Sequence, residues 1–424
     1  MSTALEIAAS AAEAPLSRPL RLPCGVTLPN RVAKAALSEQ LSDRNNRPTA
    51  DIVRLYERWG RSGAGMLLTG NVMVDPRALE EPRNVVVEDE RDLLTLARWA
   101  DAAQAHGAHC WVQISHPGRQ TMRALSGKPV APSAVKMKFG RGMYAKPRAL
   151  TAPEIEDIIA RFVRTAALCK EAGFGGVQIH AAHGYLVSAF LSPLTNRRDD
   201  AWGGSPENRR RFLVEILRRT RDAVGPRFPI AVKLNSADFQ RGGFSEEESL
   251  ETLTCLEAEG VDLVEISGGS YEQAAMMGIG PAVEARESTR LREAYFQSYA
   301  ERARRVTSLP LMLTGGFRTL GGMAAAVASE AVDLVGLGRP MCVQPELPRR
   351  LLDGTAEPIV LPPRRVGVRE LDAILEVFWY TQQLHRLARG LEPDPERGRW
   401  RSLTVALWSV LSDSLRVRFR RRRR

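Results

Sequence analysis

Residues 176–185 read Gly-Val-Gln-Ile-His-Ala-Ala-His-Gly-Tyr, an apolar run that ends in polar side chains able to carry protons. A continuous apolar run of this length is typical of a buried strand in a parallel sheet, whereas half-exposed strands alternate. The chain has only six histidines in 424 residues, and two of them, His180 and His183, lie in this stretch with Tyr185. The stretch therefore predicts a buried strand whose end carries chemistry.

Seven further runs of the same kind flank this one, and a helical stretch follows each of them. The eight predicted strands are Val32–Leu37, Gly65–Thr69, His109–Ser115, Gly176–His180, Ile230–Asn235, Leu263–Ser267, Leu311–Thr314 and Asp333–Gly338. Eight alternations predict an α/β protein folded as a (β/α)8 TIM barrel, with an open doubly wound sheet as the alternative. A barrel places its chemistry at the C-terminal ends of the strands, which is where the distinctive residues of this chain occur.

The helices between the runs have start signals. Two sequences fit the capping box, in which a hydroxyl and a carboxylate satisfy free helix amides: Thr151-Ala-Pro-Glu154 and Ser245-Glu-Glu-Glu248. Ser205 precedes Pro206 as an N-cap before a first-turn proline. Before the first run, residues 18–26 predict a short hairpin around Gly25.

The end of the fourth strand suits catalysis on a carbonyl compound. Two imidazoles, His180 and His183, can donate hydrogen bonds to one oxygen and stabilise negative charge that develops there. The hydroxyl of Tyr185 can supply a proton nearby. The alternatives are two structural histidines or a metal pair, and the chain has no carboxylate or third-histidine motif that would complete a metal site.

Glycines follow the last two strands. Thr314-Gly-Gly-Phe-Arg318 comes after the seventh, and Gly336-Leu-Gly-Arg-Pro340 ends the eighth. Barrels often bind phosphate at these two loops, where backbone amides point at the anion and glycine permits close approach. Each stretch alone is compatible with a tight turn, and the pair predicts a phosphate site. No P-loop and no dinucleotide fingerprint after a strand occurs in the chain.

A polar side chain, Gln113, lies inside the third apolar run, and another, Lys233, lies inside the fifth. A buried lysine is costly unless it is paired, so an inward Lys233 requires an anionic partner. The alternative is a lysine in water at the barrel rim.

Over about residues 18–353, the chain resembles the Old Yellow Enzyme family of FMN-dependent NAD(P)H oxidoreductases. The motifs that carry the resemblance are Pro29-Asn-Arg-Val32 with Ala35-Ala-Leu-Ser38, Gln113-Ile-Ser-His-Pro-Gly-Arg119, Gly176–His180, Leu191-Ser-Pro-Leu-Thr-Asn-Arg197, Gly203-Gly-Ser-Pro-Glu-Asn-Arg209 and the two glycine stretches. The resemblance implies a TIM barrel with FMN across its C-terminal mouth. It also implies reduction of the flavin by NADH or NADPH, followed by hydride transfer to an activated alkene such as an enone.

The resemblance also implies roles for single residues. His180 and His183 would polarise the substrate carbonyl, and Tyr185 would donate the α-proton. The flavin would be contacted by Ala36, Leu37 and Ser38 from the first strand, by Gly70 beside the ring, by Gln113 at the pyrimidine edge and by Lys233 at its N1 side. The phosphate would be held by Gly315, Gly316, Gly338 and Arg339. No metal is expected.

Four positions depart from the family pattern. Ser38 stands where many members have Thr or Cys, Lys233 where many have Arg, and Trp202 where Tyr is usual. Glu39-Gln40 replaces an aromatic residue on the substrate side of the first loop. These departures bear on the substrate more than on the cofactor. Two alternatives share the same barrel: a flavin-dependent demethylase or dehydrogenase, and a flavin-holding binding protein without alkene turnover.

The formal net charge of +11 is unevenly distributed along the chain. Residues 361–424 contain 15 Arg, no Lys and 7 acidic residues, so this segment carries +8 and the first 360 residues only +3. The five cysteines are far apart and form no C-x-x-C pair. No segment has the apolar length of a membrane span or the pattern of a signal peptide. We expect a cytoplasmic protein.

The predicted organisation has three parts: a flexible leader over 1–16, an FMN-binding barrel over 17–355, and a helical basic extension over 356–424. Apolar residues recur at helical steps over 366–390, and a second apolar segment, 403–415, runs into the terminal arginines. The extension is interpreted as a helix docked on the barrel with a basic end, as a surface helix on an anionic membrane through 401–424, or as a subunit contact in a homo-oligomer. Nucleic acid is not expected, because no basic surface with interleaved aromatic residues accompanies the arginine run.

Overall fold

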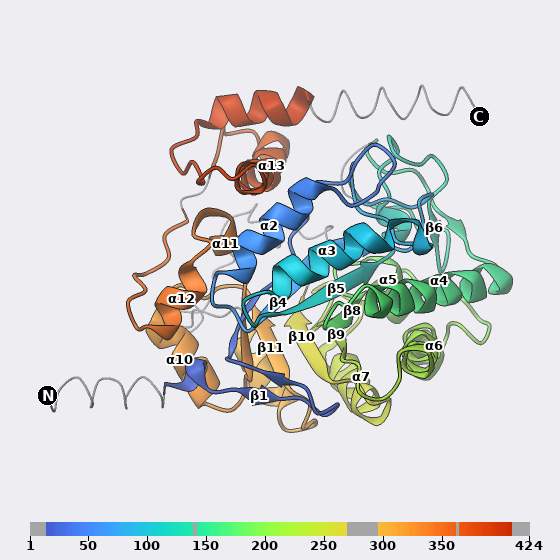
Figure 1. The fold of residues 1–424 in the computed structure, drawn as a ribbon. Helices are drawn as coiled ribbons and strands as arrows, with labels where there is room; N and C mark the ends of the chain where they lie inside the picture. The colour runs from blue at the N-terminus through green and yellow to red at the C-terminus, as the bar shows by residue number, and fades with distance from the viewer. Residues whose placement is uncertain (1–13, 139–141, 269–295, 362–363, 409–424) are drawn as a thin grey trace, which may run out of the picture.

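The computed structural model describes residues 14–138, 142–268, 296–361 and 364–408. Eight parallel strands close into a barrel in the order β10-β11-β12-β3-β4-β5-β8-β9 (Figure 1). They are β3 (Val32–Lys34), β4 (Met66–Met73), β5 (His109–Ser115), β8 (Gly176–Ala181), β9 (Ile230–Asn235), β10 (Leu263–Ser267), β11 (Leu311–Thr314) and β12 (Leu334–Leu337). The predicted (β/α)8 barrel is confirmed, and the alternative of an open sheet is wrong.

All eight apolar runs form barrel strands, and four of them match to the residue. Every residue of β4, β8, β9, β10 and β12 is buried, because one face of the sheet fills the barrel and the other is covered by helices. The first run ends as a strand at Lys34, earlier than predicted. Strand β4 continues to Met73 and shifts its register against β5 between Leu68 and Asn71.

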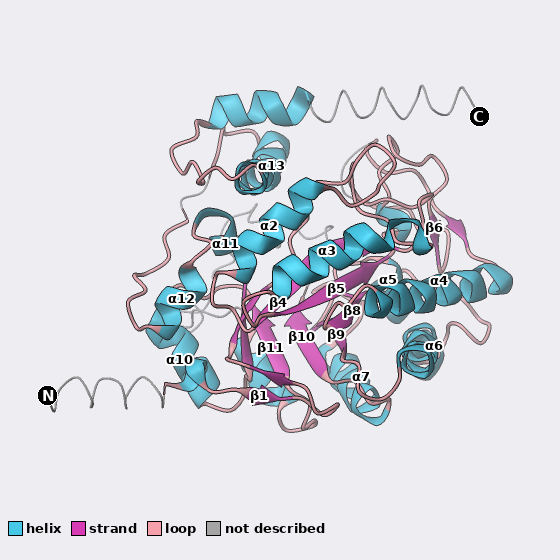
Figure 2. Ribbon diagram, viewed as in Figure 1, coloured by secondary structure: helices cyan, strands magenta, loops and turns pink. Residues whose placement is uncertain are grey.

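Helices surround the barrel on the outside (Figure 2). They are α2 (Ala50–Gly60), α3 (Leu93–Gln104), α4 (Ala152–Glu171), α5 (Leu186–Leu191), α6 (Pro206–Val224), α7 (Glu246–Ala258), α9 (Gln297–Ala303), α10 (Leu320–Ala328), α11 (Pro340–Val343), α12 (Leu347–Leu352) and α13 (Arg369–Ala388). Both predicted capping boxes form, at the starts of α4 and α7. Ser205 caps α6 by accepting from the Asn208 amide.

Short elements lie outside the eight barrel strands. The predicted hairpin is β1 (Leu20–Arg21) paired with β2 (Thr27–Leu28), turning at Gly25, which has φ +90°. A small two-stranded sheet, β6 (Val130–Ala131) with β7 (Arg148–Ala149), was not predicted. Three 3₁₀ turns complete the described elements: η1 (Pro15–Ser17), η2 (Glu90–Asp92) and η3 (Gly118–Gln120).

The C-terminal extension packs on the barrel shell through α13, which lies against α2 and α11 (Figure 1). Its buried residues include Leu375 and Trp379, and Arg54 of α2 donates from Nε to the carbonyl of Ala388 at 2.8 Å. This arrangement fits the interpretation of a docked helix. Residues 399–408 are also helical, whereas 409–424, which contain the last seven arginines, lie outside the described residues. None of the described helices is long and apolar enough to cross a bilayer.

Candidate active site

The three predicted catalytic side chains come together at the C-terminal end of β8. The ring centroids of His180 and His183 are 5.0 Å apart, and those of His180 and Tyr185 are 4.8 Å apart. His180 is the last-but-one residue of β8, and the turn that follows, before α5, brings the other two rings back over it. The sequence prediction that these residues form one cluster is therefore realised by a single tight turn.

His180 is held neutral and as one tautomer. Burial lowers its pKa well below the usual range for histidine, and His183 and Lys233 lower it further. Its Nδ1 accepts a hydrogen bond from the Ala182 amide at 3.2 Å. A neutral imidazole whose Nδ1 accepts must carry its proton on Nε2. His180 is therefore a neutral hydrogen-bond donor through Nε2.

His183 occupies the strained point of the turn, with φ +62°. Its amide donates to Oδ1 of Asn235 at 3.1 Å, and its Nε2 lies 2.7 Å from the Ser267 hydroxyl. Burial lowers its pKa well below the usual range, with Lys233 as the second cause. A non-glycine residue at positive φ persists only where its surroundings fix it, and here the ends of β9 and β10 do so.

Tyr185 meets a carboxylate that the sequence did not single out. Its hydroxyl donates to Oε1 of Glu80, which lies in the long segment between β4 and η2. Oε2 of Glu80 accepts from the side-chain amide of Asn71 in β4. Tyr185 is 3% exposed and Glu80 7%, so this contact is shielded from bulk water.

A polar chain crosses the barrel interior below these residues. Nε2 of Gln113 donates to Gln178 at 2.7 Å, and Nε2 of Gln178 donates to Glu265 at 2.9 Å. The other oxygen of Glu265 accepts from Lys233 Nζ at 2.9 Å. The anionic partner required by Lys233 is thus Glu265 on the neighbouring strand, where the two residues are register partners.

The loop after β3 leads toward the mouth. Ala36, Leu37 and Ser38 are half-buried between buried neighbours, as expected for residues that border an opening. Gly70 lies at the irregular point of β4, where its amide donates to Oε1 of Glu39 at 2.7 Å. A Cβ at Gly70 would collide with the Glu39 carboxylate and with the Leu37 carbonyl, so this position requires glycine.

A second buried ionic group supports that loop from behind. Lys34 donates to the Tyr56 hydroxyl at 3.2 Å and to the Leu68 carbonyl at 2.6 Å, and Tyr56 donates to Glu39. Burial lowers the pKa of Lys34 to about 8, and the nearby Glu39 carboxylate is the largest opposing cause. Glu39 therefore fixes the backbone around Gly70 instead of lining the substrate side of the first loop.

The predicted phosphate loops carry suitable groups. Gly315 and Gly316 have φ of +107° and +90°, which orients successive amides in ways that other residues rarely allow. The hydroxyl of Thr314, directly before them, is buried and has no hydrogen-bond partner among the described residues. A Cβ at Gly338 would meet only the end of the Leu37 side chain within 4 Å, at 3.7 Å. Glycine amides with an orphaned hydroxyl and a guanidinium suit a phosphate.

Arg339 is the guanidinium of this group, and it is already engaged by the C-terminal extension. Its Nη1 contacts Oε1 of Glu376 in α13 at 2.6 Å, and its guanidinium lies 5.9 Å from the ring centre of Tyr380. The side chain remains 42% exposed, so donors stay available for a second anion.

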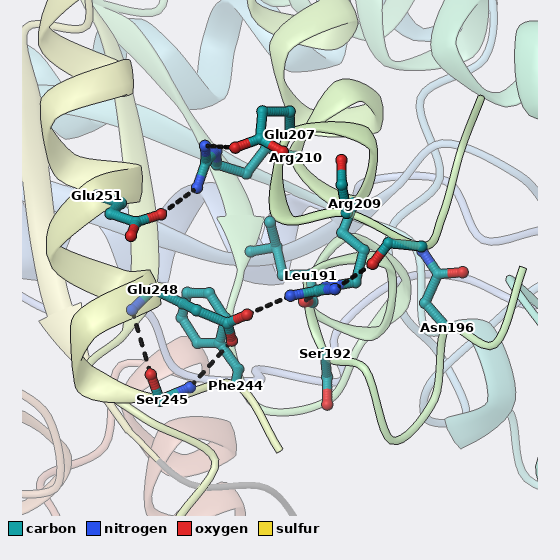
Figure 3. A network of polar contacts seen from close by, with 12 residues as sticks. Leu191, Ser192, Asn196, Glu207, Arg209, Arg210, Phe244, Ser245, Glu248 and Glu251 are labelled. Carbon is teal, nitrogen blue, oxygen red and sulfur yellow. Dashed lines mark hydrogen bonds and ion pairs between the residues drawn. The ribbon is translucent and has the colours of Figure 1, made fainter. Parts of the chain in front are cut away.

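The most distinctive sequence motif, Leu191 to Arg209, is structural (Figure 3). Arg209 donates to the carbonyls of Leu191, at 2.9 Å, and Gly204, and to the Glu248 carboxylate that also caps α7. The amide of Asn196 donates to two further carbonyls, both at 2.8 Å. This network fixes α6 and α7 relative to the α5 loop, beside the turn that carries His183 and Tyr185.

Five polar residues of the candidate site were not predicted from the sequence: Lys34, Asn71, Glu80, Gln178 and Glu265. Three of them are polar residues inside apolar strand runs, which is the signal that singled out Gln113 and Lys233, so they were detectable. Asn71 and Glu80 follow or lie beyond the second predicted strand and have no such signal.

Comparisons with known proteins place this chain in a family. The sequence profile of the NADH:flavin oxidoreductase / NADH oxidase family matches residues 15–357. The NADH-dependent flavin oxidoreductase iliE of Hypocrea jecorina is 38% identical over 362 residues, covering 80% of this chain and 90% of that protein. The enzyme iccE of Talaromyces variabilis, described in the same words, is 35% identical and covers 88% of this chain and 98% of its own.

Solved structures of known reductases are similar to this chain in fold. Morphinone reductase superposes with a TM-score of 0.68 at 25% identity, covering 82% of this chain and 91% of its own. A 2-naphthoyl-CoA reductase bound to 2-naphthoyl-CoA superposes with a TM-score of 0.73 at 28% identity, covering 80% of this chain and 52% of its own.

Proposed function

This chain belongs to the NADH:flavin oxidoreductase / NADH oxidase family, the Old Yellow Enzyme family that its motifs resembled, and from this premise we propose that it reduces the C=C bond of activated alkenes. Its cofactor is FMN, and NADH or NADPH is the reductant. The observation that carries the proposal is the cluster of His180, His183 and Tyr185, in which a neutral donor and a hydroxyl lie side by side at the barrel mouth.

The residues around the mouth fit FMN. The phosphate would be held by the glycine amides of 315, 316 and 338, with Thr314 and Arg339 beside them. The isoalloxazine ring would contact residues 36–38, Gly70, Gln113 and Lys233, as expected from the sequence. When bound, FMN supplies the hydride. The tasks left to the protein are to bind and orient the alkene, to stabilise charge on its carbonyl oxygen and to provide a proton.

His180 stabilises the charge on the carbonyl oxygen as a hydrogen-bond donor. A neutral imidazole that donates from Nε2 strengthens its bond to a carbonyl oxygen as that oxygen becomes negative. The low pKa of His180 keeps the ring neutral at pH 7. The ring therefore donates a hydrogen bond to the substrate carbonyl oxygen without transferring its proton. The hydroxyl of Tyr185, adjacent to His180, then protonates the carbon next to the carbonyl.

The proposal is tested by following the flavin of the purified holoenzyme without oxygen. NADH or NADPH bleaches the flavin, and a panel of enones, maleimides and nitroalkenes is then added to reoxidise it. We expect His180→Ala to lose both alkene turnover and binding of carbonyl ligands. Tyr185→Phe should keep ligand binding and lose turnover by about 100-fold or more, the usual range for a general acid.

His106→Ala is the matched control, because His106 is exposed at the opposite end of the barrel, before β5. It should leave reduction and reoxidation unchanged. A wild-type flavin that NADH reduces but that no alkene reoxidises would contradict alkene reduction and favour the dehydrogenase or flavin-holding alternatives.

A further inference from the structure

The contact between Tyr185 and Glu80 has a chemical consequence for any reaction in which Tyr185 gives up its proton. The phenol donates to one oxygen of Glu80, and Asn71 donates to the other. Tyr185 and Glu80 are both buried, so a negative charge on Glu80 is poorly screened by water.

The position of Glu80 is set in advance by its neighbours. Oδ1 of Asn71 accepts from the Ser38 hydroxyl at 3.0 Å and from the amide of Asn84 at 3.2 Å. The hydrogen-bonded chain Ser38–Asn71–Glu80–Tyr185 therefore joins the loop after β3, strand β4 and the turn after β8. A carboxyl whose two oxygens accept from Tyr185 and from a fixed Asn71 keeps its geometry toward the Tyr185 oxygen during a reaction.

An ionised Glu80 opposes proton donation by Tyr185. Once the phenol has lost its proton, a phenolate and a carboxylate would lie in hydrogen-bond contact in a buried site, and two like charges there are strongly unfavourable. The conflict disappears when Glu80 carries a proton, because it then donates to the phenol oxygen through the same contact.

We propose that Glu80 is the proton-exchange partner of Tyr185, so that the two residues form a relay into the substrate site. As the C–H bond forms at the alkene carbon, the O–H bond of Tyr185 breaks and is restored by the proton of the Glu80 carboxyl. The negative charge ends on Glu80, which water reprotonates afterwards. The electron pair comes with the hydride of the family's established reaction. This inference rests on the proposed alkene reduction.

The test compares Glu80→Gln with the neighbouring Glu81→Gln in the holoenzyme. The amide introduced by Glu80→Gln keeps the shape of the side chain and its ability to hydrogen-bond, but it cannot exchange a proton. Glu81 is bonded to Gln40 and to Ser38, so Glu81→Gln controls for replacing a carboxyl by an amide next to Glu80 in the same loop. NADH reduction of the flavin needs no proton from Tyr185 and should stay within about twofold in both variants. Reoxidation by the alkene should fall about 10-fold or more in Glu80→Gln alone, less than the roughly 100-fold effect of a direct general acid because Glu80 acts through Tyr185.

A double variant separates a relay from a structural role. In the background Tyr185→Phe the hydroxyl is absent, so Glu80→Gln should cause no further loss of reoxidation rate. An additional loss there would overturn the relay, as would equal losses in Glu80→Gln and Glu81→Gln, an unchanged rate in Glu80→Gln, or loss of bound FMN from that variant. Failure of the wild-type enzyme to react with any alkene refutes the proposed function itself, and is seen before any variant is made.

Discussion

At the scale of single residues, the barrel interior shows what a buried charge requires. Lys233 lies in an apolar strand, which indicates that an anion must be near it, but the sequence does not say which anion. The resemblance points to the reduced flavin, whereas the structure supplies Glu265 at 2.9 Å. A lysine already paired with a carboxylate offers less net positive charge to a bound flavin.

This pairing predicts the redox effect of Glu265. Glu265→Gln leaves Lys233 uncompensated, so the anionic reduced flavin should be stabilised and its midpoint potential should rise, by on the order of 30 mV for about 1.4 kcal/mol in a two-electron couple. Lys233→Met should lower the potential. Spectroelectrochemical titration of the holoenzymes measures both. An unchanged or lowered potential in Glu265→Gln would show that the pair does not act on the flavin.

At the scale of elements, apolar runs and capping boxes predict the strands and several helix starts, because both patterns depend on local contacts. The periodicity over 366–390 also predicts a helix, observed as α13 (Arg369–Ala388). The sequence alone does not decide between the three interpretations of how this extension docks. Docking is decided by side chains far away in the sequence, such as Arg54 with the Ala388 carbonyl and His385 with the Glu39 carbonyl at 2.9 Å.

The contact of α13 with Arg339 predicts an effect on FMN affinity. Glu376 and a phosphate need the same guanidinium, so Glu376→Gln should tighten FMN binding to the apoprotein by about threefold to tenfold, or roughly 1 kcal/mol for a partly exposed pair. Quenching of FMN fluorescence measures the Kd. Glu392→Gln is the control, because Glu392 pairs with Arg58 and not with Arg339. Weaker binding in Glu376→Gln would mean that Glu376 orients Arg339 for the phosphate.

At the scale of the whole molecule, burial of histidines couples stability to pH. Burial lowers the pKa of five of the six histidines: His109, His116, His180, His183 and His385. For His116 the pKa falls to about 4. Below the unfolded value of about 6.5, the unfolded chain therefore binds more protons than the folded one, and acid favours unfolding.

The free energy of unfolding should fall as the pH drops from about 6.5 toward 4, by about 1.4 kcal/mol per pH unit for each histidine that stays neutral in the folded state. Urea unfolding at pH 7, 6 and 5 measures the slope. His116→Gln should reduce the slope by the share of one histidine, whereas His106→Gln, at an exposed position, should not. A slope that is the same in wild type and His116→Gln would contradict the assignment.

The division into a leader over 1–16, a barrel over 17–355 and an extension over 356–424 stays a prediction, as do membrane contact through 401–424 and a homo-oligomer. The separation of charge along the chain is a property of the sequence. The arginines beyond residue 408 lie outside the described residues.

The sequence by itself determined the barrel, the grouping of His180, His183 and Tyr185 at the end of β8 and the family. These depend on strand-length apolar runs and on residues adjacent in the chain, so local pattern is enough. Only the tertiary structure decided that Glu265 compensates Lys233, that Glu80 receives the Tyr185 hydroxyl and that α13 reaches Arg339. Each of these contacts joins segments more than thirty residues apart, 32, 105 and 37 along the chain, and closure of the barrel with its shell brings them together.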